Sequence, residues 1–96
     1  MNPKSSTPID IELGRRLREA RERIGLSQTT LGEAVGVTFQ QVQKYEKGQN
    51  RLSVVRLLSI ANALNTPVES FLEGLSDMAR GEQNRQSRGS RRWPKK

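Results

Sequence analysis

Amide and ammonium side chains alternate with apolar ones along the stretch TFQQVQKYEK, residues 38–47. On a helix, with about 100° between successive residues, Gln40, Lys44 and Lys47 lie opposite Val42. The amide of glutamine has a donor and an acceptor on one planar group and can pair bidentately with adenine, while lysine matches the acceptors of guanine. Such a face is typical of a helix that hydrogen-bonds to base edges. It also occurs on solvated helices, and composition alone favours the solvated face.

The elements that would position these side chains are helices. One apolar stripe recurs at i, i+4, i+7 and i+11 and ends before Gly25: Leu13, Leu17, Ala20 and Ile24. The residues expected to cap or open the next four helices are Ser27, Thr38, Ser53 and Thr66-Pro67. Their core faces are expected to carry Leu31, Val35, Val42, Tyr45, Leu57, Ile60, Ala61, Leu64, Val68, Phe71 and Leu72. No alternating strand pattern occurs, so the sequence predicts a compact all-α domain of five short helices.

Charge divides the chain into parts. The net charge is +7, but residues 9–74 have nine basic and eight acidic residues, whereas residues 75–96 have seven basic and two acidic ones. We therefore expect a flexible N-terminus (1–8), a folded domain (9–74) and a basic, mostly disordered tail (75–96). The tail has few apolar residues besides Trp93, which predicts disorder from about Gly81 onward. A helical extension through Leu75 and Met78 is the alternative for its start.

Several classes of chemistry are excluded by what the sequence lacks. The chain has no cysteine and no histidine, which excludes disulfides, zinc fingers, thiol nucleophiles and histidine-based acid–base catalysis. No phosphate-binding loop, metal-ligand spacing or paired carboxylates on an apolar face occur. We expect neither an enzyme nor a bound cofactor or metal. No apolar run is longer than two or three residues, so we expect no signal peptide and no membrane span, and a cytoplasmic protein.

The run GLSQTTLGEAVGVTFQQVQKYEKG, residues 25–48, resembles the helix-turn-helix of the Cro/phage-repressor (XRE-like) family of bacterial transcription regulators. The matching positions are Gln28, Leu31, Gly32, Gly36, Val42, Tyr45, Glu46 and Gly48. The resemblance extends over residues 10–74 and includes IANALNTPVESFLEG, which is similar to the last two helices of the family. In this fold Gly36 would need a positive φ in the turn, and Gly32 would permit close approach of the second and third helices.

The resemblance also implies roles for individual residues. The third helix would lie in the major groove, and the residues expected to contact bases are Phe39, Gln40, Gln43 and Lys44. Those expected to contact phosphates are Ser27, Gln28, Thr38, Lys47, Gln49, Asn50 and Arg51. Arg21 and Glu46 would form an ion pair between the first and third helices. For Phe39, packing against the domain at the start of the helix remains an equal alternative.

These expectations together favour a sequence-specific double-stranded-DNA-binding regulator, specifically a repressor that binds inverted repeats as a homodimer. The apolar residues expected in the dimer contact are Val68, Phe71, Leu72, Leu75 and Met78. Two alternatives use the same fold: an antitoxin-like autoregulator whose tail binds a partner protein, and an adaptor that binds proteins only. The basic tail would otherwise supply non-specific attraction to DNA.

Overall fold

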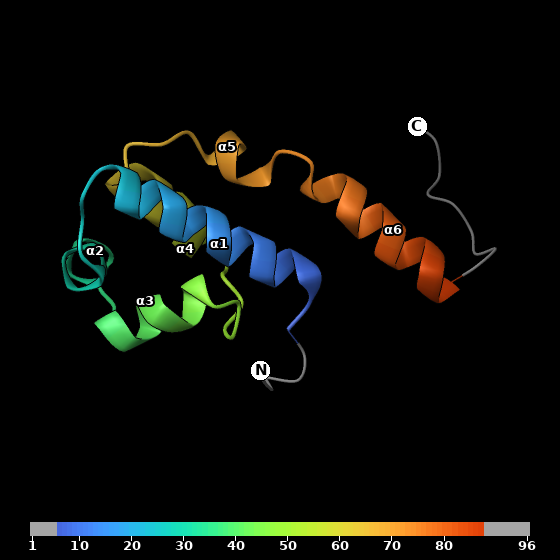
Figure 1. Cartoon of the computed structure of the whole chain (residues 1–96), viewed down its shortest axis with the longest axis horizontal. Helices are drawn as coiled ribbons and strands as arrows, with labels where there is room; N and C mark the ends of the chain where they lie inside the picture. Colours follow the sequence, from blue (N-terminus) through green and yellow to red (C-terminus); the bar gives the residue numbers. More distant parts are fainter. Residues whose placement is uncertain (1–5, 88–96) are drawn as a thin grey trace.

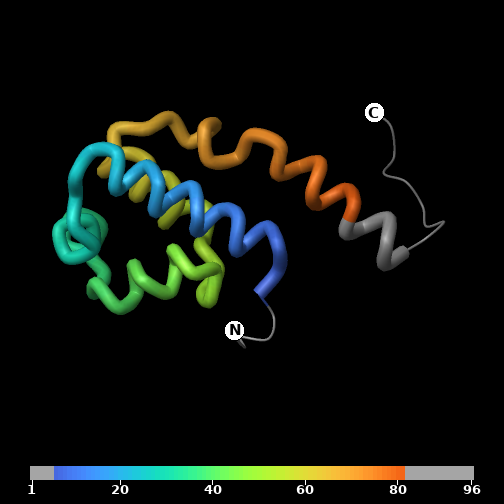
Figure 2. Tube along the Cα trace, in the orientation of Figure 1, coloured from blue at the N-terminus to red at the C-terminus, as the bar shows by residue number. Residues whose placement is uncertain are grey.

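The structure, a computed structural model, describes residues 6–87 and the side chains of residues 6–81. This part of the chain is all-α, as predicted, with no strand within it. Its helices are α1 (Pro8–Arg23), α2 (Gln28–Val35), α3 (Phe39–Glu46), α4 (Val54–Ala63), α5 (Val68–Leu72) and α6 (Leu75–Ser87). Helix α1 lies centrally, with α3 on one side and α5 and α6 on the other (Figures 1 and 2). No helix in the described residues is both long and apolar enough to cross a bilayer.

Hydroxyl side chains set where the first four helices begin. In α2, α3 and α4 the predicted N-caps Ser27, Thr38 and Ser53 each accept a hydrogen bond from the backbone N–H three residues later. Helix α2 ends at Gly36, whose φ of +81° is the left-handed conformation that glycine adopts without strain. The two helices of the predicted helix-turn-helix therefore begin and end where the local sequence requires.

A single core joins α1–α5. Its fully buried side chains are Phe71, Leu17, Leu31, Ile60, Leu64 and Val42. Two glycines permit the close helix contacts around it. A Cβ on Gly32 would lie 2.5 Å from the carbonyl oxygen of Val37, which agrees with the close approach predicted there. A Cβ on Gly14, a residue for which no role was predicted, would lie 2.3 Å from the carbonyl oxygen of Tyr45, so α1 and α3 approach this closely only because the residue is glycine.

The N-terminal boundary and two helix ends differ from the prediction. Helix α1 begins at Pro8, and Thr7 and Asp10 form a reciprocal capping box, so the predicted flexible segment 1–8 is too long. Ile24 is exposed and not part of the buried stripe, because the helix ends at Arg23 and Ile24 lies in its C-cap. Pro67 is the N-cap of α5 and not its first residue.

The start of the basic tail is helical. Helix α6 extends to Ser87 and projects away from the other helices (Figure 1), so the helical extension considered as the alternative is present and includes residues 81–87, where composition predicts disorder. The segment has little apolar surface to bury, which is why its composition predicts disorder. Leu75 is buried, which anchors the first turn of α6 to the domain, and the following turns need only local helical hydrogen bonds. Residues 88–96, with Trp93, lie outside the described residues.

Candidate nucleic-acid interface

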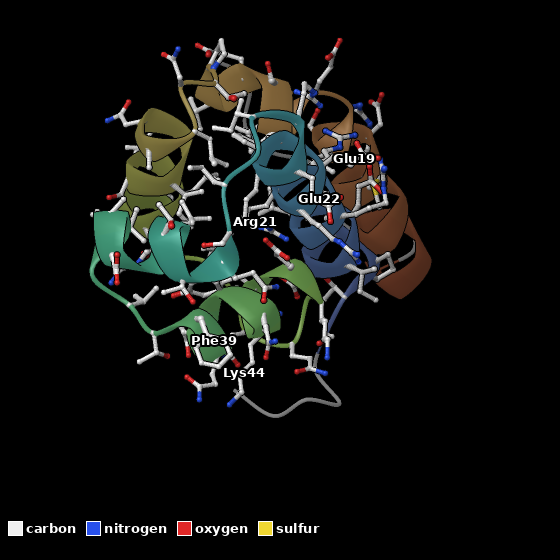
Figure 3. The ribbon with its side chains drawn as sticks, turned by 60° about the vertical axis from the view of Figure 1, so that its left-hand side comes forward. Glu19, Arg21, Glu22, Phe39 and Lys44 are labelled. Atoms are coloured by element: carbon white, nitrogen blue, oxygen red, sulfur yellow. The ribbon has the colours of Figure 1, made fainter. Side chains whose placement is uncertain are left out.

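Helix α3 has one face in the core and one in solvent. Val42, Tyr45 and Glu46 are buried, whereas Gln40 and Lys44 are exposed. The orientation predicted from the helical wheel is thus the one observed. Figure 3 shows the Phe39 and Lys44 side chains on the outer side of α3, away from the other helices.

Phe39 is 43% exposed, so packing against the domain, the alternative left open from the sequence, is not what the structure shows. Side chains on a helix lean over the preceding turn, and Phe39 is the first residue of α3 and has no such turn beneath it. The outer face of α3 therefore combines an aromatic ring, an amide and an ammonium group.

A hollow lies beside this face, where the N-terminus of α2 meets the second half of α3. It is lined by Arg18, Arg21, Ser27, Gln28, Gln43, Glu46 and Lys47. Four of these are residues predicted to contact DNA, and they come from two helices and a turn. The unpaired N–H groups at a helix N-terminus favour anions, and Lys47 adds a positive charge. Arg18 was missed because its i, i+4 spacing from Glu22 is that of an ordinary surface pair.

The expected ion pair between Arg21 and Glu46 is present and is almost entirely buried. Arg21 Nε and Nη2 donate to the two carboxylate oxygens of Glu46 at 2.6 and 3.1 Å, and Arg21 Nη1 donates to the carbonyl oxygen of Leu26 at 2.7 Å. The side chains of Arg21 and Glu46 are 10% and 3% exposed. Because Leu26 lies between α1 and α2, the one guanidinium fixes both α3 and this link to α1.

Glu46 also holds Gln28, at the start of α2. Gln28 Nε2 donates to Glu46 Oε1 at 3.0 Å, so part of the amide predicted to contact phosphate is used inside the protein. Glu46 thus accepts hydrogen bonds from α1 and from α2 while it belongs to α3. A contact of Gln28 with DNA would have to use the rest of its amide or its backbone N–H.

The remaining predicted phosphate contacts lie at the N-cap of α3, which is Thr38, and in the link between α3 and α4. Thr38, Lys47 and Gln49 are exposed, and Asn50 is half-buried. The backbone N–H of Gln49 donates to the carbonyl oxygen of Lys44 at 2.9 Å, which holds the link against the end of α3. Arg51 is not an isolated cation, because Asp10 in the first turn of α1 accepts its Nε and Nη2 at 3.3 and 3.2 Å.

The apolar surface differs from the one expected at a dimer contact. Phe71 on α5 and Leu75 at the start of α6 are buried in the domain, where both helices contact α1, and cannot face a partner. Val68 packs against the core, Met78 is half-buried, and only Leu72 of the predicted set is exposed. Among the described residues, the two most exposed large apolar side chains lie instead on α4, Val54 (73% exposed) and Val55 (77%), and Leu58 (45%) is on the same helix.

Comparison with known proteins agrees with this geometry. An uncharacterized HTH-type transcriptional regulator of Sinorhizobium medicae is 53% identical over 72 residues, which are 75% of this chain and 52% of the relative. An uncharacterized transcriptional regulator in the ATPase CF(0) region of Rhodospirillum rubrum is 42% identical over 85 residues, 88% of this chain and 76% of the relative. The chain spans about half the length of the rhizobial relatives it matches.

Two solved structures share the fold. The restriction-modification controller protein C.AhdI from Aeromonas hydrophila has a TM-score of 0.61 and 38% identity, covering 64% of this chain and 88% of that one. The P22 c2 repressor in complex with a synthetic operator has a TM-score of 0.59 and 27% identity, covering 65% and 94%. A family model described as helix-turn-helix matches residues 17–71. Together with the buried and exposed faces of α3, these matches show that the chain belongs to the Cro/C1-type helix-turn-helix family of transcriptional regulators.

Proposed function

We propose that the chain binds double-stranded DNA with α3 in the major groove and regulates transcription from that site. The observation that supports this most is the exposed face of α3, on a helix whose opposite face is held in the core. Gln40 and Lys44 read base edges, and Gln43 and Phe39 contribute at the flank and at the start of the helix. The thymine methyl group is the apolar contact suited to an exposed aromatic ring.

Phosphate contacts hold α3 in register. The hollow lined by Ser27, Gln28 and Lys47 accepts one backbone phosphate, with the N-terminus of α2 directed at it. Thr38 and the link after α3, with Gln49, Asn50 and Arg51, contact the backbone on the other side. These contacts set position, and the base contacts choose the sequence.

Two copies act together. A helix of eight residues is about 12 Å long and reaches only a few base pairs, which is too few to specify a site. The exposed apolar face of α4, formed by Val54, Val55 and Leu58, follows the phosphate-contacting link directly in the chain. A twofold contact through this face would place two α3 helices on one side of the duplex, with half-sites about one helical turn apart. The P22 c2 repressor, crystallised with an operator, supports DNA as the partner.

The regulator acts in the cytoplasm and, as we infer, represses transcription. Its basic tail, residues 75–96, adds non-specific attraction to DNA or binds a protein partner. Removing the tail distinguishes these roles. Weaker binding to every duplex with a flatter salt dependence supports contact with DNA, and unchanged salt dependence supports a protein partner.

Selection of bound duplexes from a random pool tests the main proposal. The expected result is an inverted repeat with two half-sites and a protected footprint with twofold symmetry. A single asymmetric half-site bound by one copy would contradict the dimer. Failure to bind any duplex at low salt would contradict DNA binding and favour the protein-binding adaptor.

A further inference from the structure

The link between α3 and α4 is docked on the beginning of α1 and the residue before its cap, 37 to 42 residues earlier in the chain. Ser6 Oγ donates to the carbonyl oxygen of Gly48 at 2.5 Å. Gly48 lies against the backbone of α1 so closely that a Cβ there would be 2.7 Å from the Cα of Ile11. The third contact is the pair between Asp10 and Arg51. Three residues at or near the start of α1, Ser6, Asp10 and Ile11, therefore support the link that contains predicted phosphate contacts.

Asp10 is the buried partner of this ion pair and Arg51 is the exposed one. The Asp10 side chain is 9% exposed and that of Arg51 is 56% exposed. Asp10 Oδ2 accepts from the Thr7 backbone N–H and from Thr7 Oγ1, both at 3.0 Å, which fixes the carboxylate in the capping box of α1. Arg51 then donates to both oxygens through Nε and Nη2. A carboxylate that the first turn of α1 holds rigidly thus sets the orientation of a largely exposed guanidinium.

The carboxylate is charged at neutral pH. Burial raises the pKa of Asp10, but the hydrogen bonds from Arg51 and Thr7 outweigh it and hold the pKa below its ordinary value of 3.8. The hydrogen bonds to Arg51 are therefore charge-assisted at both ends. Arginine loses considerable rotamer freedom when it binds a phosphate, and a side chain oriented beforehand loses less.

We propose that Asp10 is a positioning residue for DNA binding: it orients the guanidinium of Arg51 toward a backbone phosphate beside α3. The inference rests on the proposed function, because Arg51 needs a phosphate to meet. It adds the first turn of α1 to the DNA-binding apparatus, although Asp10 is acidic and would repel DNA if it stood alone at the surface. The alternative is that Asp10 competes with DNA for Arg51 and weakens binding.

The test compares Asp10→Asn, Arg51→Gln and the double variant with a matched control, Thr7→Val. The control removes the hydroxyl of the same capping box but leaves the carboxylate of Asp10 and its pair with Arg51. Binding of the full chain to the duplex selected by the wild type is measured at salt concentrations from about 0.05 to about 0.3 M. The slope of log affinity against log salt is determined over this range for each variant. Circular dichroism identifies a temperature at which every variant is folded, and ethylation interference maps the phosphates contacted.

For each half-site, Arg51→Gln should flatten the slope of log affinity against log salt by about 0.9 and weaken binding about fivefold at 0.15 M salt. Asp10→Asn should weaken binding in the same direction by up to that factor and lose interference at the same flanking phosphate. In the Arg51→Gln background, Asp10→Asn should change affinity no further, and Thr7→Val should retain the wild-type slope and interference pattern.

Three results would overturn the inference. Tighter binding by Asp10→Asn would mean that Asp10 withholds Arg51 from DNA. Equal effects of Asp10→Asn and Thr7→Val would mean that Asp10 only stabilises α1, and additive effects in the double variant would mean that Asp10 does not act through Arg51. If the wild-type chain selects no duplex at all, the proposed function fails before any variant is compared.

Discussion

Replacing Arg21 by leucine should destabilise the domain more than any replacement of an exposed arginine on α1. The change leaves Glu46, whose side chain is 3% exposed, with the Gln28 amide as its remaining hydrogen-bond donor in the described residues. Removing one partner of a buried ion pair costs about 3–5 kcal/mol, because the other charge stays buried without compensation. A domain of about 80 residues has a free energy of unfolding of roughly 4–12 kcal/mol, so the loss is a large fraction of it.

The assay is thermal and urea unfolding followed by circular dichroism at neutral pH. A loss of about 3 kcal/mol should lower the melting temperature by roughly 12–24 °C in a domain of this size. Arg18→Leu is the matched control, because Arg18 lies on the same helix and pairs with Glu22 in solvent, where ion pairs contribute little. The double variant Arg21→Leu/Glu46→Leu should recover much of the loss, since no buried charge remains.

Melting temperatures of Arg21→Leu and Arg18→Leu within a few degrees of each other would contradict this prediction. It is also refuted if the double variant loses as much stability as the two single changes added together. Either result would mean that the Arg21–Glu46 pair stabilises the fold no more than a surface pair does.

Three further predictions concern the exposed face of α3, the exposed apolar face of α4 and the dependence of stability on pH. Gln40→Ala should cost roughly 1–3 kcal/mol of binding and relax base preference in a repeated selection, whereas Val42→Ala should keep the preference and lose roughly 2 kcal/mol of stability in urea melts. Val55→Glu should shift sedimentation toward the monomer, and Ile24→Glu, at another exposed apolar site, should not; equal shifts would contradict a contact through α4. Since the pKa of Asp10 is lowered by folding, the stability it contributes is complete above pH 3.8 and declines as pH falls through the folded-state pKa. Asp10→Asn should therefore reduce the acid-dependent loss of stability, and an unchanged pH profile would contradict this.

Local chemistry explains why most of the fold could be predicted from the sequence. A hydroxyl at an N-cap acts on an N–H three residues away, and a glycine acts on its own φ, so Ser27, Gly36 and Thr38 predict the ends of the two helices by themselves. Helical periodicity is equally local. It predicts a buried Val42 and an exposed Gln40 without reference to the residues that pack against them. The resemblance to the repressor family depended on these same spacings.

Local patterns were therefore enough to predict the first five helices, the exposed polar face of α3 and the family. Which polar side chains pair with one another depends instead on how the helices pack. Gln28 and Glu46 are 18 residues apart, and Asp10 and Arg51 are 41 apart, so no periodicity relates them. Tertiary packing also determines which apolar side chains are buried: Phe71 and Leu75 lie in the interior, whereas Val54 and Val55 remain exposed. A local pattern indicates which face of a helix is apolar, but whether that face meets the core depends on how the other helices pack around it.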